Sequence, residues 1–130
     1  MLIKRIIEPA RLRRIPAHFS WVDHRLVQDR HIERCDPYAA ALYLFLVTVG
    51  DAQGLSYYSD NSLAERLSIA LGRLSQSRDD LIRAGLIAYE RPLYQVLALD
   101  SPIPQGGQAQ ATGIQARLLR LHEIVGRRLP

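Results

Sequence analysis

The sequence holds a single cysteine, Cys35, among its 130 residues. One thiol excludes an internal disulfide and suits a reducing compartment. Long hydrophobic runs are also missing, because the longest one, residues 39–49, is too short to span a bilayer. The partly apolar start of the chain is interrupted by Lys4 and Arg5, and no small-residue cleavage site follows it. We therefore expect a soluble, cytoplasmic protein with no membrane association.

Patterns typical of catalysis or metal binding are missing too. The glycine pair Gly106-Gly107 lies in a linker without the strand and helix that a phosphate-binding loop needs. The spacings among His18, His24, His31 and Cys35 match no usual pair of zinc ligands. The sequence contains neither a nucleophile-elbow motif nor a zinc-protease motif. We predict that the protein is not an enzyme and needs no metal or cofactor.

Charge is distributed unevenly along the chain. The net charge is +4 and the pI is near 9.6. Residues 1–34 carry eight basic and four acidic side chains, residues 35–100 carry five and eight, and residues 101–130 carry four and one. The two ends are therefore basic, while the middle has a balance of −3. An anionic partner would be attracted mainly by the ends.

The middle of the chain opens with a strong helix signal. Asp36-Pro37 places a hydrogen-bond acceptor at the N-cap and a proline at the first helical position. The helix predicted over residues 37–49 is apolar nearly all round, so we expect it to be buried on most sides as the central core helix. Gly50 would end it. Residues 51–54 have the composition of a turn, and residues 55–58 read as a short strand.

Two further helices are predicted after this strand. Ser59-Asp60 would cap a helix over residues 61–67, and residues 68–70 would turn the chain into a helix over residues 71–84. Gly85 would end the latter. The spacing of apolar residues predicts that both helices pack inward through a set of six side chains: Leu63, Ala64, Leu67, Leu74, Leu81 and Ile82.

The remaining segments complete a mainly α fold with a small β hairpin and a C-terminal helix. Two strand-like runs, residues 86–89 and 94–99, predict the hairpin, with its turn at residues 90–93. We divide the chain into an N-terminal arm and extended segment (1–35), a domain (36–100), a linker (101–113) and an amphipathic helix (114–130). The helix has an apolar seam that we expect to mediate a homodimer: Ile114, Leu118, Leu121 and Val125.

The N-terminal arm combines basic and aromatic residues. Residues 11–14 are basic and precede Pro16, which predicts an extended arm. Residues 19–27 are rich in aromatic and branched side chains and read as a short strand or extended segment. We expect this segment to cover the core with Phe19, Trp21 and Val22. Residues 28–35 are polar and predict a loop or a helical turn.

The stretches Leu63–Leu67 (LAERL) and Leu81–Ile87 (LIRAGLI) resemble the LAxRL … LxxxGLI pattern of winged helix-turn-helix domains. With the extended segment 19–27 and the turn Asp51–Gly54, the chain is similar to the DNA-binding module of phage and plasmid replication initiators and DnaD-type primosome proteins. It is also similar to small winged-helix proteins encoded near bacterial mobile elements. The resemblance covers roughly two-thirds of the chain. It implies a DNA-binding protein that acts as a transcriptional regulator or as a replication or transposition accessory factor.

The resemblance also implies which residues contact double-stranded DNA. The helix over residues 71–84 would enter the major groove, where Arg73, Ser75 and Gln76 contact base edges. Arg73 suits guanine and Gln76 suits adenine. Three further contacts with the DNA are expected outside this helix. The backbone amides of Asn61 and Ser62, at the start of the preceding helix, would bind a phosphate. The hairpin tip and the basic arm would contact the DNA through Arg91, Arg11, Arg13 and Arg14.

Four positions depart from the family pattern. Ala70 stands where a serine or threonine often caps the DNA-reading helix, and Arg78 occupies a position that is normally apolar. Asp79 and Asp80 place two carboxylates on that helix, where they would repel phosphate. Winged helices also serve as protein-interaction modules. The alternative is therefore an adaptor that binds another protein, through this acidic helix or the C-terminal helix, without contacting DNA.

Overall fold

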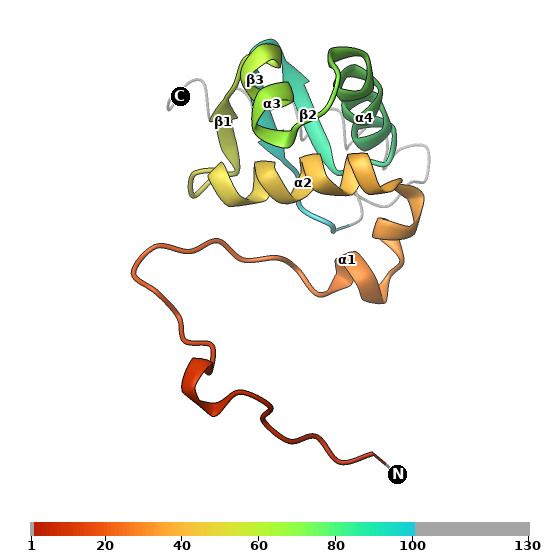
Figure 1. The fold of residues 1–130 in the computed structure, drawn as a ribbon. Helices are drawn as coiled ribbons and strands as arrows, with labels where there is room; N and C mark the ends of the chain where they lie inside the picture. Colours follow the sequence, from red (N-terminus) through yellow and green to blue (C-terminus); the bar gives the residue numbers. More distant parts are fainter. Residues whose placement is uncertain (1, 101–130) are drawn as a thin grey trace, which may run out of the picture. The chain divides into compact units, whose positions relative to one another are not determined.

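The computed structural model describes residues 2–100 and shows an α+β fold, in which helices pack with a three-stranded antiparallel sheet (Figure 1). The predicted linker and C-terminal helix, with Ile114, Leu118, Leu121 and Val125, lie outside the described residues. The fold below is that of the first compact unit, which ends at Leu97. Its elements are η1 (Pro9–Arg11), α1 (Arg25–Gln28), η2 (His31–Arg34), α2 (Pro37–Val49), β1 (Leu55–Tyr57), α3 (Asp60–Leu67), α4 (Leu71–Arg83), β2 (Ile87–Glu90) and β3 (Leu93–Val96).

The N-terminal segment is an exposed chain up to Val22, with the short η1 as its regular element. The strand considered for residues 19–27 is not formed. Asp23 instead accepts a hydrogen bond from the backbone N–H of Arg25 at 2.9 Å, which starts the single helical turn of α1. A strand here would leave its backbone groups without a partner strand, whereas a helical turn pairs them locally.

The expectation that this segment covers the core through its aromatic residues was wrong. Phe19, Trp21 and Val22 are exposed to 63%, 76% and 45%, respectively. Leu26 of α1 is the residue that is buried. The predicted helical turn in residues 28–35 is present as η2.

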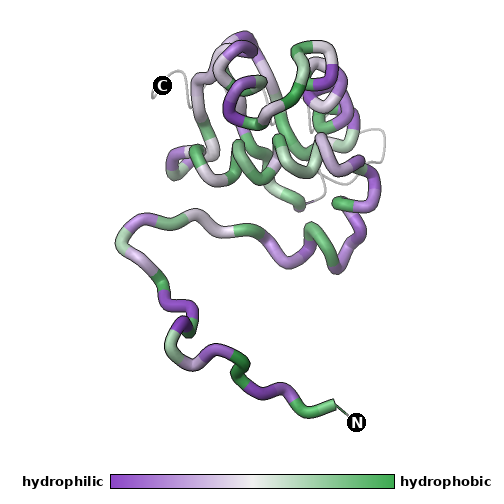
Figure 2. Tube along the Cα trace, viewed as in Figure 1, coloured by the Kyte–Doolittle hydropathy of each residue, from purple (hydrophilic) through white to green (hydrophobic). Residues whose placement is uncertain are grey.

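Helix α2 begins and ends where the sequence predicts. The side chain of Asp36 accepts a hydrogen bond from the N–H of Ala39 at 2.8 Å, and Gly50 follows the last helical residue. Figure 2 shows that the helix is apolar along its length. Only one side is buried, however, because α4 and β3 pack against that side, while Leu44 remains 61% exposed. The prediction that α2 is buried on most sides was therefore wrong.

Helices α3 and α4 follow β1 and are joined by a tight turn. The hydroxyl of Ser59 accepts a hydrogen bond from the N–H of Ser62, which caps α3 as predicted. Of the residues expected to pack inward, Leu63, Leu74 and Leu81 are buried. Ile82 is 41% exposed, so its predicted core position was wrong. At 100° per residue, Ile82 is turned away from the buried face, on which Ser77 lies between Leu74 and Leu81.

The hairpin of β2 and β3 completes the sheet, with strand order β1-β3-β2. Tyr94 lies in the central strand, opposite both Ser56 and Tyr89, and is fully buried. Gly54 has a φ of +82° and bonds through its carbonyl to the N–H of Val96 at 2.9 Å. A side chain at Gly54 would meet the carbonyl oxygen of Val96, so a glycine is required where β1 joins the sheet. Across residues 2–100, every helix lacks the combination of length and apolar content needed to cross a membrane.

Candidate nucleic-acid interface

The turn between α3 and α4 exposes the first half of α4. Ser68 adopts a left-handed conformation with φ of 57°, and the N–H of Ile69 donates to the carbonyl of Ala64 at 3.0 Å. No side chain caps α4 at Ala70. A Cβ built on Gly72 meets no atom within 4 Å. The start of α4 is therefore open to an approaching ligand.

Three residues predicted to contact bases lie together on α4. Arg73, Ser75 and Gln76 are all exposed. Ser75 and Gln76 share the open face of Gly72, because residues three and four apart are neighbours on a helix. Arg73 lies to one side of that face, with its Cζ 4.5 Å from the centroid of the Tyr38 ring of α2. Its Nη1 is also 3.4 Å from the Gln76 Oε1.

The start of α3 is less available to a phosphate than the sequence suggested. Asn61 is exposed and Ser62 is half-buried. The N–H of Ser62 already donates to the Ser59 hydroxyl at 3.1 Å, so this amide is not free. The prediction of a free Ser62 amide was therefore wrong, because the same serine that caps the helix uses the donor.

The other predicted contacts lie at the edges of the unit. Arg91 is exposed at the tip of the hairpin, between β2 and β3. Arg11, Arg13 and Arg14 are exposed on the N-terminal segment. Within residues 2–100, no hydrogen bond or ion pair links the side chains of these three arm arginines to α3, α4 or the hairpin.

A structural cluster around Arg78 was missed by the sequence analysis. The Arg78 side chain, only 11% exposed, donates from Nη1 to the Asp60 carboxylate and to the Tyr94 hydroxyl, both at 2.8 Å. Its Cζ also lies 4.4 Å from the centroid of the Tyr89 ring. The cluster joins α3 and α4 to β2 and β3. It explains why an arginine is accepted at a position expected to be apolar.

Electrostatics in this cluster favour the ion pair. Burial opposes the charged form of Arg78, but the hydrogen bonds that its guanidinium donates to Asp60 and Tyr94 outweigh that effect, so the pKa of Arg78 is raised. Burial raises the pKa of the Tyr94 phenol, and the guanidinium partly offsets that effect. Neither sequence spacing nor composition points to the cluster, because Asp60 and Arg78 are 18 residues apart.

Ion pairs neutralise part of the charge on α4. Asp80 pairs with Arg83, and Arg78 pairs with Asp60, whereas Asp79 is exposed. Among the described residues of the domain, three arginines have no ion pair with a carboxylate: Arg66, Arg73 and Arg91. Of the two carboxylates predicted to repel phosphate, Asp80 is therefore offset by its ion pair with Arg83, and Asp79 is the one that remains.

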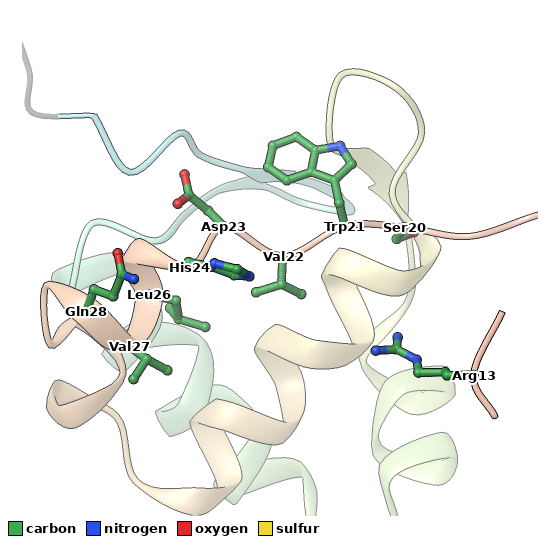
Figure 3. A pocket seen from close by; sticks show the side chains of 9 residues that line it. All are labelled: Arg13, Ser20, Trp21, Val22, Asp23, His24, Leu26, Val27 and Gln28. Atoms are coloured by element: carbon green, nitrogen blue, oxygen red, sulfur yellow. The ribbon is translucent and has the colours of Figure 1, made fainter. Parts of the chain in front are cut away.

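A hollow beside α1 is lined by Arg13 and by residues of the segment 20–28 (Figure 3). The hydroxyl of Ser20 donates to the carbonyl of Thr48, which fixes the segment beside the end of α2. The one carboxylate in the hollow, Asp23, is already hydrogen-bonded to Arg25, which lowers its pKa to about 2. The hydrogen bonds of Ser20 and Asp23 hold the segment in place, and the indole of Trp21 remains exposed.

Two further features of residues 2–100 bear on reactivity, namely the Cys35 thiol and the placement of side chains that could bind a metal ion. Burial raises the pKa of the Cys35 thiol, which disfavours the reactive thiolate. Within the same residues, no group of three or more histidine, cysteine, aspartate or glutamate side chains is placed to bind a metal ion.

No protein-family model matches the chain, and comparisons with curated proteins and with solved structures find no significant match.

Proposed function

We propose that residues 36–97 form a winged helix-turn-helix domain that binds double-stranded DNA through the first half of α4. The observation that supports this most is the order α2-β1-α3-α4-β2-β3 with an open α4 start. A tight turn joins α3 to α4, and a hairpin follows them in a sheet of order β1-β3-β2. The major groove of B-DNA admits an α-helix whose N-terminal residues contact base edges.

The side chains on the open face of α4 suit this role. Gln76 carries both a donor and an acceptor and can bond an adenine in two places, and the Ser75 hydroxyl can donate or accept. Gly72 lets the DNA backbone or base edges come close to the helix. Arg91, at the exposed hairpin tip, would contact the backbone beside the groove. Such a protein would serve as a transcriptional regulator or as a replication or transposition accessory factor.

The arm completes the electrostatic part of binding. Residues 35–100 have a balance of −3, and phosphate contacts supply much of the affinity of DNA-binding proteins. Arg11, Arg13 and Arg14 are exposed and would neutralise phosphates flanking the groove. In this proposal α4 gives the orientation and the arm adds affinity. A homodimer would double both contributions.

Binding can be tested by fluorescence anisotropy, using a labelled duplex of random sequence and the full chain at several salt concentrations. The proposal predicts binding that weakens steeply with salt. The substitution Gln76→Glu should weaken binding about 10-fold or more, because it puts a carboxylate against phosphate and base acceptors. Gln53→Glu, which makes the same charge change at an exposed turn position, is the matched control. The proposal is refuted by an absence of binding at low salt, or by equal effects of the two substitutions.

A protein-interaction module remains the second candidate, and one observation favours it. Phe19 and Trp21 are exposed to 63% and 76%, and Leu44 of α2 is exposed to 61%. Exposed aromatic residues are enriched at protein interfaces. In this case Phe19→Ser and Trp21→Ser would abolish association with a protein partner, and DNA affinity would be absent in the unchanged chain as well.

A further inference from the structure

Two arginines at opposite ends of the α3–α4 turn have no ion pair with a carboxylate in the part of the chain that the structure describes. Arg66 is in the last turn of α3 and Arg73 is in the first turn of α4, and both are exposed. Neither forms an ion pair with any carboxylate of residues 2–100. The other two arginines of α4 differ, since Arg78 is paired with Asp60 and Arg83 with Asp80.

Each of these arginines lies on an aromatic ring of α2. The Cζ of Arg73 is 4.5 Å from the centroid of Tyr38, and the Cζ of Arg66 is 5.6 Å from the centroid of Phe45. Tyr38 and Phe45 are seven residues apart on the same helix, which places them on one side of α2 and about 10 Å apart along its axis. The two guanidinium groups therefore lie along the same side of α2, one before and one after the turn that joins α3 to α4.

Stacking on a ring holds a guanidinium without using its donors. The attraction acts through the face of the ring, so the N–H groups at the edge of the planar fork stay available, apart from the one that Arg73 donates to the Gln76 Oε1 at 3.4 Å. Such a fork matches two oxygens of a phosphate. Holding the side chain beforehand also reduces the conformational entropy lost on binding. Arg78 is different, because Asp60 and Tyr94 already accept from its fork.

We propose that Arg66 and Arg73 form a phosphate clamp, in which each guanidinium binds a backbone phosphate of the same duplex DNA. The clamp rests on the proposed function, and it assigns Arg73 to the DNA backbone instead of to a guanine base. Ser75 and Gln76 keep the base-facing role, since they lie on the open face and Arg73 lies toward α2. Tyr38 and Phe45 are positioning residues that act through the two arginines.

The slope of log affinity against log salt concentration tests the clamp, because it counts the phosphates neutralised. We would measure it with the full chain, a random-sequence duplex and the variants Arg66→Gln and Arg73→Gln. Each should lower the slope by about 0.9 and weaken binding on the order of 10-fold at 0.1 M salt, and the double variant should lower the slope by about 1.8. The matched control is Arg83→Gln, which makes the same charge change at an arginine already paired with Asp80, and should leave the slope unchanged.

A second set of variants separates the effect of the Tyr38 ring on DNA affinity from the effect of the Arg73 charge. Tyr38→Leu keeps Arg73 charged but removes its ring, so affinity should fall a few-fold with the slope unchanged, whereas Tyr38→Phe should bind like the original chain. A Tyr38→Leu affinity equal to that of the original chain would overturn the positioning role of the ring.

The remaining outcomes distinguish the clamp from the proposed function. If the unchanged chain does not bind DNA, both fail. If the chain binds but Arg66→Gln and Arg73→Gln behave like Arg83→Gln, only the clamp fails. A loss seen only with one guanine-containing sequence would show that Arg73 contacts a base, which also overturns the clamp.

Discussion

The guanidinium of Arg78 lies 2.8 Å from the carboxylate of Asp60, and this ion pair connects α4 directly to α3. The same guanidinium donates to the hydroxyl of Tyr94 in the central strand. The relative placement of the two helices thus depends on a charge that is largely removed from water. In the proposed function this placement decides whether the open start of α4 can enter a groove.

Replacing Arg78 should destabilise the fold strongly. Arg78→Met keeps the length of the side chain but leaves the Asp60 carboxylate and the Tyr94 hydroxyl without their donor. We expect a loss of about 2 kcal/mol in the free energy of unfolding, measured by urea denaturation. Arg83→Met removes an exposed pair and should cost less than about 0.5 kcal/mol. Equal losses for the two variants would contradict the structural role assigned to Arg78.

The sequence predicts the elements that local signals define. Asp36-Pro37 and Gly50 bound α2 correctly, and Ser59 caps α3, because a cap depends on a few neighbouring residues. What covers an apolar residue depends on distant parts of the chain. Helical spacing therefore placed Ile82 in the core, and apolar composition placed the aromatic residues of the N-terminal segment there, but the structure has them exposed.

The candidate site was predicted only in part, for a related reason. The exposed positions on α4 follow from helix geometry once the helix is recognised. The Arg78 cluster and the ring contacts of Arg66 and Arg73 join elements far apart in the sequence, and no local pattern encodes them. The Arg78 cluster depends on how α3 and α4 pack with the hairpin, and the two ring contacts depend on how α3 and α4 pack against α2.

A serine at position 70 should stabilise the protein. Ala70 has the extended φ and ψ of an N-cap, −72° and 153°, but its side chain cannot accept a hydrogen bond. Ala70→Ser would supply an acceptor for the first free amides of α4, and we expect a gain of about 1 kcal/mol in the free energy of unfolding. Conversely, Ser59→Ala should lose a similar amount from α3. Thermal and urea denaturation of both variants would measure these effects, and an Ala70→Ser variant no more stable than the original chain would count against the uncapped start of α4.

Two glycines should respond oppositely to substitution by alanine. At Gly54 the φ of +82° and the nearby carbonyl of Val96, 2.8 Å from a built Cβ, leave no room for a side chain. Gly54→Ala should cost about 2 kcal/mol and disturb the pairing of β1 with β3. Gly72 has open space in a helix, so Gly72→Ala should stabilise by about 0.5 to 1 kcal/mol. Amide exchange of β1 would report the first effect, and the prediction fails if both substitutions change stability in the same direction.

The contact between Asp23 and Arg25 at the start of α1 should survive to a lower pH than a contact made by an ordinary aspartate. The side-chain and backbone hydrogen bonds from Arg25 lower the pKa of Asp23 from 3.8 to about 2. Because the folded pKa is below the unfolded one, the stabilisation is present above about pH 4 and is lost as the pH falls through about 2. The amide shift of Arg25, followed by NMR, should titrate with a midpoint near 2 and should not titrate in Asp23→Asn. A midpoint near 4 would show that the contact is not formed in solution.

The most direct test of DNA binding through α4 is an NMR titration of the full chain with a short DNA duplex. Amide shifts should change most at residues 70–76, at the hairpin tip around Arg91 and along the basic arm. They should change little in the turn between α2 and β1, around Gln53. If the duplex produces no shifts at low salt, or produces them mainly around Trp21 and α1 while residues 70–76 stay unchanged, α4 does not contact DNA and the proposed function is wrong.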